Sequence, residues 1–136
     1  MNGTFARSTS ELSREDIEKR LSLWCALSEL FLDTERQAAD FDRVAAAVVN
    51  ARVSADEARE ILENEVAPAF IANTLSVAGE WAGWPEGFVR QRVLAHLGSG
   101  AARRAWRVLQ ARLHKDMYEG AWAEVAYRLS CTEKAR

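Results

Sequence analysis

The feature that most constrains this chain is the spacing of its apolar residues, which recur every three or four positions over most of its length. This spacing appears in one segment at Ile17, Leu21, Trp24, Leu27 and Phe31, and residues 41–49 repeat it in the next. Such a period places apolar side chains along one face of an α-helix. No segment alternates apolar and polar residues between turn signals, as a half-buried strand does. The sequence therefore predicts an all-α protein.

Breaks in this pattern divide the chain into six or seven short helices. Only two prolines and seven glycines occur among 136 residues, a length typical of one domain. We expect a compact irregular or orthogonal bundle over residues 13–131, with a disordered tail at 1–12 and a short tail at 132–136. The expected helices are 13–32, 38–52, 55 to a break or kink at Pro68, short pieces within 67–85, 86–97, 101–115 and 120–130.

Two of these helices begin with a recognisable cap, and the helical period predicts which side chains face the core. Ser54 and Glu57 form a capping box, and Ser13 forms a similar one with Asp16. The side chains predicted to face inward from the later helices are Ala58, Ile61, Leu62, Val66, Val93, Leu97, Ala102, Trp106, Leu109, Leu113, Trp122, Val125, Ala126 and Leu129.

Charge is unevenly distributed, although the net charge is only −2. Residues 1–68 carry 8 basic and 14 acidic side chains, a balance of −6, whereas residues 69–136 carry 10 basic and 6 acidic ones, a balance of +4. Such a distribution either steers a charged partner or holds the two halves together. The longest uncharged run, residues 66–79, is shorter than the roughly 20 residues of a membrane span. We therefore expect no membrane-spanning segment, and the N-terminus lacks the apolar core of a secretory signal.

The reactive residue types show no pattern typical of catalysis, of a metal site or of a cofactor site. His96 and His114 have no partner at the spacing of a triad or a metal pair, and the two cysteines lack a metal or redox spacing. We expect a non-catalytic protein without a metal or a cofactor. The alternative is an enzyme built on Glu29, Asp33 and Glu80, which requires these acids to meet in one cleft.

Two groups of residues are candidates for binding a partner. The first group, at the end of the first helix, consists of Glu29, Asp33 and Glu35. These acids either contact a partner or form a solvated helix end. The second group consists of Glu80, Trp81 and Trp84. Glu80 is the only charge between residues 66 and 86, so it either anchors a binding groove or pairs internally with an arginine.

The helix expected at 101–115 is strongly basic and suggests nucleic-acid binding as an alternative function. Together with the preceding helix and the turn at 98–100, it resembles a helix-turn-helix in which Arg103, Arg104 and Arg107 would face phosphates. Any antiparallel helix pair with a glycine turn has this appearance. A sequence pI of about 5.7 also opposes the basic surface that nucleic-acid binders need.

Three sequence strings, taken together, resemble a family of small uncharacterised bacterial all-helical proteins. They are ALSELFLDTE at 26–35, ILENEVAPAF at 61–70 and SVAGEWAGW at 76–84. The likeness covers about residues 16–100 and implies no catalytic residues. Small, acidic, helical proteins of this kind are frequently immunity proteins. By analogy of fold and size, the resemblance therefore implies a cytoplasmic immunity or inhibitor protein.

On this hypothesis the partner is a protein, a bacterial toxin or effector with a basic surface. The two candidate groups above would supply acidic and aromatic contacts, joined by Asp56, Glu60 and Glu63 on one face of the third helix. A solvated exterior would show the same arrangement of acids. A homodimer through an exposed Trp84 or Trp122 is a further alternative.

Overall fold

The computed structural model describes residues 13–31, 37–75 and 85–135. Within these ranges every regular element is helical, which confirms the predicted all-α fold. In chain order the elements are α1 (Arg14–Ser28), the 3₁₀ turn η3 (Glu29–Phe31), α2 (Ala38–Asn50), α3 (Ala55–Ile61), the π turn η4 (Leu62–Val66), α4 (Ala67–Leu75), α5 (Glu86–Leu97), α6 (Ala101–Leu113) and α7 (Asp116–Ala135).

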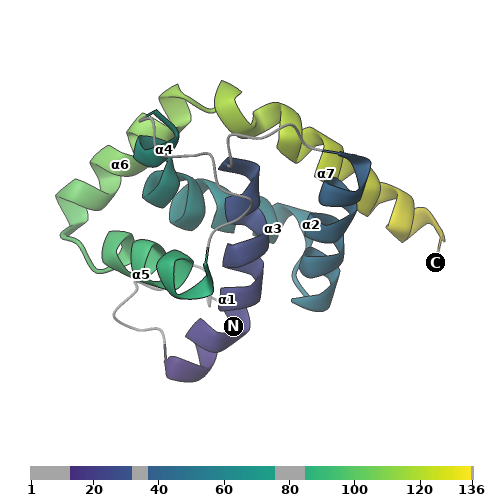
Figure 1. Ribbon diagram of the computed structural model, residues 1–136, viewed down its shortest axis with the longest axis horizontal. Helices are drawn as coiled ribbons and strands as arrows, with labels where there is room; N and C mark the ends of the chain where they lie inside the picture. The colour runs from purple at the N-terminus through teal and green to yellow at the C-terminus, as the bar shows by residue number, and fades with distance from the viewer. Residues whose placement is uncertain (1–12, 32–36, 76–84, 136) are drawn as a thin grey trace.

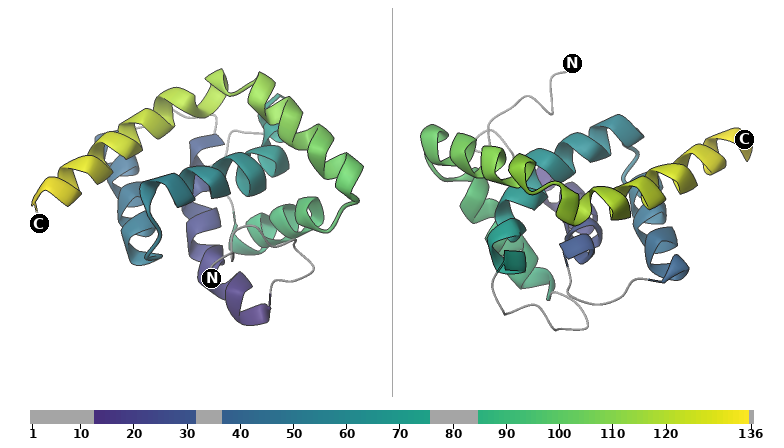
Figure 2. Two further views of the ribbon diagram at one scale, coloured as in Figure 1. Left: turned by 180° about the vertical axis from the view of Figure 1, so that it is seen from behind. Right: turned by 90° about the horizontal axis from the view of Figure 1, so that it is seen from above.

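Helix α1 lies at the centre of the bundle. It packs against α5 on one side and against α2 on the other, while α6 and α7 form an arch along one edge of the molecule (Figure 1). The same arch is seen from behind, where α3 and α4 cross α1 (Figure 2). Helix α7 packs along α2, and α6 packs along α4.

Both predicted capping boxes are present. The Ser13 hydroxyl accepts a hydrogen bond from the Asp16 backbone N–H at 3.1 Å, and the Ser13 backbone N–H donates to the Asp16 carboxylate at 3.3 Å. Ser54 and Glu57 make the same reciprocal pair at 3.0 and 2.8 Å. These side chains satisfy donors that the first helical turn leaves without a backbone partner, and so they fix where α1 and α3 begin.

The chain does not break at Pro68 as the sequence suggested. Helices α3 and α4 are joined by the π turn η4 into one helix over residues 55–75, here called the α3–α4 helix. Proline has no N–H to donate to the Asn64 carbonyl four residues earlier. The helix widens at this place, so that Ala67 donates to the Leu62 carbonyl, and His96 of α5 lies with its Nε2 atom 2.9 Å from the Asn64 carbonyl oxygen. A histidine from another helix thus replaces the donor that Pro68 lacks.

The core extends from α1 through α4 to α7. Trp24 and Phe70 are fully buried. The ring of Phe31 lies 6.4 Å from that of Phe70 and 5.3 Å from that of Tyr118. The inward-facing residues predicted for α3, α5 and α7 are confirmed as buried or partly buried. Trp122 is 5% exposed, so the proposed homodimer contact through this residue was wrong.

The prediction for α6 was also wrong. Ala102, Trp106, Leu109 and Leu113 were expected to face the core, but all four are exposed. The exposed fractions of the last three are 58%, 47% and 70%. Ala111, on the opposite side of the helix, is the one buried residue of α6. Helix α6 therefore packs on α4 through its small and basic side and turns its apolar side outward.

Candidate interaction surface

The outer side of α6 carries a continuous row of apolar side chains. Ala102, Trp106, Leu109 and Leu113 follow one another at intervals of four, three and four residues, and together they form what is called here the α6 stripe. Five large hydrophobic side chains are exposed in the described part of the chain, and three of them belong to this stripe. At 13 residues, α6 spans about 20 Å.

Arg104 explains why the other side of α6 faces the protein. Its Nη1 atom donates to the Leu97 carbonyl at 3.2 Å and to the Ser99 carbonyl at 2.6 Å. These carbonyls end α5 and begin the following turn, where a cation is favourable. Arg104 thus joins α5 to α6. The helix-turn-helix hypothesis required Arg103 and Arg104 to lie on the same exposed face, and they do not.

The remaining arginines of α6 surround the stripe. By the helical period, Arg103 and Arg112 lie at its two edges, and Arg107 lies further round on the Arg103 side. Arg103 and Arg112 are exposed and Arg107 is half-buried. None of the three forms an ion pair with another described residue. The sequence from 87 to 115 carries no Asp or Glu, so these residues contribute only positive charge to the surface.

A small cavity opens where α4, α5 and α6 meet, on the Arg107 side of the helix. Its volume is about 200 Å³, and its lining residues are Pro68, Ala69, Ile71, Arg92, Ala95, Arg107 and Gln110. Arg92 donates to the Ala69 carbonyl at 3.1 Å, and its guanidinium lies 5.8 Å from the centre of the Phe88 ring. Two arginines thus line a recess whose other lining residues, apart from Gln110, are apolar. This chemistry suits an acidic side chain with an aliphatic stem.

The acidic set predicted on the third helix is partly neutralised. Asp56 and Glu60 are exposed, and the half-buried Glu63 accepts a hydrogen bond from Arg59 Nε at 2.9 Å. Arg59 also lies 4.0 Å from Glu119 of α7. The positive charge of Arg59 therefore lies beside these acids and makes this face less negative than the acids alone would.

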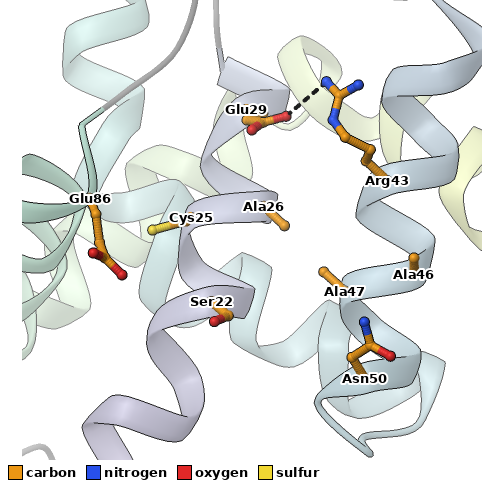
Figure 3. A pocket seen from close by; sticks show the side chains of 9 residues that line it. All are labelled: Ser22, Cys25, Ala26, Glu29, Arg43, Ala46, Ala47, Asn50 and Glu86. Carbon is orange, nitrogen blue, oxygen red and sulfur yellow. Dashed lines mark hydrogen bonds and ion pairs between the residues drawn. The ribbon is translucent and has the colours of Figure 1, made fainter.

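Glu29 borders a separate, open cavity of about 510 Å³ between α1, α2 and the start of α5. Figure 3 shows Glu29 directed toward Arg43 of α2, with Cys25 and Glu86 on the other side of α1. Glu29 lies 3.5 Å from Arg43, which also binds Asp40. These contacts between exposed side chains link α1 to α2 but are worth little individually.

Cys25 in the same cavity is a poor nucleophile. Burial, with smaller contributions from Glu86 and Glu29, raises the pKa of its thiol to about 11. The thiol is therefore protonated at neutral pH, whereas nucleophilic attack requires the thiolate.

Glu65 forms a buried polar cluster that sequence reasoning missed. Its carboxylate accepts hydrogen bonds from Arg20 Nη1 at 2.6 Å and from Trp24 Nε1 at 2.8 Å. Burial raises the pKa of Glu65, and both partners oppose that rise. The signal was present, because Glu65 lies four residues after Ile61 and falls on the same inward face.

Several predicted site residues are not placed. Asp33, Glu35, Glu80, Trp81 and Trp84 lie outside the described residues, so neither binding group can be assembled from them. Within the described ranges, no group of three or more His, Cys, Asp or Glu side chains could hold a metal ion. No helix in those ranges is long and apolar enough to cross a membrane.

Comparison with known proteins gives a family without an assigned activity. The family described as "Domain of unknown function (DUF7079)" matches residues 18–128. The match begins within α1 and ends within α7, so it covers all elements between them and extends beyond residue 100, where the sequence resemblance ends. Neither the curated proteins nor the solved structures gave a match. The chain belongs to the DUF7079 family.

Proposed function

We propose that this chain is a protein-binding module that docks its partner on the α6 stripe. The observation that carries the proposal is the orientation of α6, with Trp106, Leu109 and Leu113 in solvent and Ala111 in the core. Burial of apolar surface contributes about 25 cal/mol of favourable free energy per Å². A partner that covers this side of α6 would therefore bind with a favourable hydrophobic contribution. Contiguous apolar patches with polar rims are typical of protein interfaces, where Trp and Arg contribute most to affinity.

The inhibitor hypothesis stays a prediction that concerns the partner. It places a basic toxin or effector on the acidic set, but Arg59 neutralises Glu63 in that set and leaves mainly Asp56 and Glu60. The surface of α6 supports a docking role better, because it combines exposed apolar side chains with Arg103 and Arg112, which form no ion pair with a described residue.

Nucleic-acid binding and catalysis receive less support from the described side chains. Arg104 holds the turn between α5 and α6 and is not available to a phosphate. The thiol of Cys25 is protonated at neutral pH, and His96 is 1% exposed. A catalytic base needs contact with its substrate, which burial denies to this histidine.

The proposal is tested by comparing what three forms of the tagged chain retain from the native host. The forms are wild type, the stripe variant Leu113→Ser, and the acidic-face variant Asp56→Lys with Glu60→Lys. Docking on α6 predicts one protein held by the wild type and by the acidic-face variant but lost from Leu113→Ser. Retention by Leu113→Ser with loss from the acidic-face variant would instead favour the inhibitor hypothesis and overturn this proposal. Equal thermal unfolding midpoints are required as a control for folding.

A further inference from the structure

We propose that the occupant of the α6 stripe is an amphipathic helix of a partner protein with acidic residues along its polar edges. This inference rests on the proposed function and states the chemistry of the partner. It follows from three properties of α6: the shape of the stripe, the charge around it, and the cavity beside it.

The shape of the stripe matches one helix face. Its residues follow one another at intervals of four, three and four, close to the 3.6 residues of one helical turn, so they form a nearly straight row on α6. A helix laid along this row would place its own apolar residues between Trp106, Leu109 and Leu113. The contact length is that of α6 itself, about 20 Å.

The charge around the stripe selects an acidic partner surface and disfavours self-association through two copies of α6. Arg103 and Arg112 border the stripe on opposite edges, and no ion pair with a described residue occupies either of them. A second α6 would bring four more arginines and no carboxylate to the contact. Like charges brought together at an interface suppress association, whereas carboxylates at both edges would pair with the guanidinium groups.

The cavity beside the stripe favours a protein over a lipid surface. Arg107 and Gln110 lead from the Arg103 edge into the recess of about 200 Å³ that Arg92 also lines. A side chain of Glu length can enter such a recess and present its carboxylate to Arg107. The headgroups of a flat lipid surface could contact the exposed side of α6, but they would not enter this recess.

The test uses two stapled helical peptides with identical leucine positions, because unconstrained peptides of this length are marginal helices in water. One peptide carries Glu along both edges and the other carries Lys, and binding to the full chain is followed by fluorescence anisotropy. The Glu peptide is expected to bind at least about tenfold more tightly at low salt, and the ratio should fall as salt screens the charges. Arg103→Glu should reduce this ratio. Arg14→Glu makes the same change at another exposed arginine, on α1, and should leave the ratio unchanged.

The other outcomes overturn the inference in distinguishable ways. Equal binding of both peptides that is lost in Leu113→Ser would reject the acidic partner but keep α6 as the docking face. Binding that Leu113→Ser leaves intact would reject the docking face as well. If the Glu peptide does not bind and the chain co-sediments with phosphatidylserine vesicles, the stripe would be assigned to a lipid surface. Failure together with a concentration-dependent dimer that Leu113→Ser abolishes would assign it to a second copy.

Discussion

The α3–α4 helix and its neighbour α6 differ in what they bury. The α3–α4 helix holds Glu65 in the core, at 8% exposure, and its apolar residues between 58 and 71 are buried with it. Helix α6 buries Ala111 and leaves Trp106 and Leu113 in solvent. The two helices pack against each other, so the contrast arises within one part of the bundle.

The buried Glu65 and the exposed α6 stripe differ in whether the chain itself supplies their contacts. Glu65 finds Arg20 and Trp24 inside the chain, and their hydrogen bonds compensate for the loss of water. The stripe on α6 has no such cover among the described residues. Substitutions of buried residues in the α3–α4 helix should therefore change folding stability, and substitutions in the α6 stripe should change association.

The largest effect is expected for Glu65→Ala. It leaves the Arg20 guanidinium and the Trp24 N–H buried without their acceptor, and breaking a buried ion pair from one side costs about 3–5 kcal/mol. The control is Glu63→Ala on the same helix, whose pair with the exposed Arg59 is worth less than about 1 kcal/mol. Urea unfolding gives the free energy of unfolding of both variants. Equal decreases would show that the buried cluster of Glu65 stabilises the fold no more than the exposed pair of Glu63 does.

The contrast between the two helices is sharpest in a matched pair of leucines. Leu62→Ala removes a fully buried side chain and is expected to cost about 2–5 kcal/mol. Leu113→Ala makes the same chemical change at a side chain that is 70% exposed, and it should alter stability by no more than about 0.5 kcal/mol. A large loss of stability in Leu113→Ala, measured by urea unfolding, would mean that the stripe is covered within the folded chain.

Sequence reasoning identified the fold because apolar spacing and caps act locally. Ser13 and Ser54 start α1 and α3 where predicted, and the inner face of α3 is correct. Of the break or kink expected at Pro68, the break does not occur, and the donor that replaces the missing N–H comes from His96, far away in the sequence. Such long-range compensation leaves no mark in the local pattern.

The interaction surface was harder to predict, because the spacing of apolar residues does not identify what covers them. The spacing of Trp106, Leu109 and Leu113 correctly indicates one apolar face of a helix, but it does not say whether that face meets the core or a partner. The side of α6 that packs inward is fixed by Arg104, whose acceptors belong to the preceding helix and turn. An arginine that looked like a phosphate ligand therefore has a structural role.

A smaller effect is expected for Arg104→Ala, which tests what orients α6. The change removes two hydrogen bonds from a charged donor to the Leu97 and Ser99 carbonyls, and we expect a loss of about 1–2 kcal/mol in the free energy of unfolding. Arg103→Ala, one residue earlier and exposed, serves as the control and should stay within about 0.5 kcal/mol of wild type. Amide hydrogen exchange in the turn at 98–100 should increase only in Arg104→Ala.

The last prediction concerns the pH dependence that His96 gives to the α3–α4 helix. Burial lowers the pKa of His96, with smaller contributions from Arg107 and Arg104, while the hydrogen bond to Asn64 opposes the shift. The neutral ring donates from Nε2, and its Nδ1 atom is buried without a hydrogen bond to a described residue.

Because the folded-state pKa of His96 is the lower one, the unfolded chain binds the proton more readily. Stability is therefore fully present above the ordinary pKa of 6.5 and is lost as the pH falls from there toward the folded-state pKa. One such site changes the free energy of unfolding by at most about 1.4 kcal/mol per pH unit. Urea unfolding between pH 8 and 5 should show a decline in wild type that is reduced in His96→Gln, whose amide can still donate to the Asn64 carbonyl. Parallel pH profiles for the two proteins would mean that other groups cause the decline and that this histidine acts only as the donor that Pro68 cannot supply.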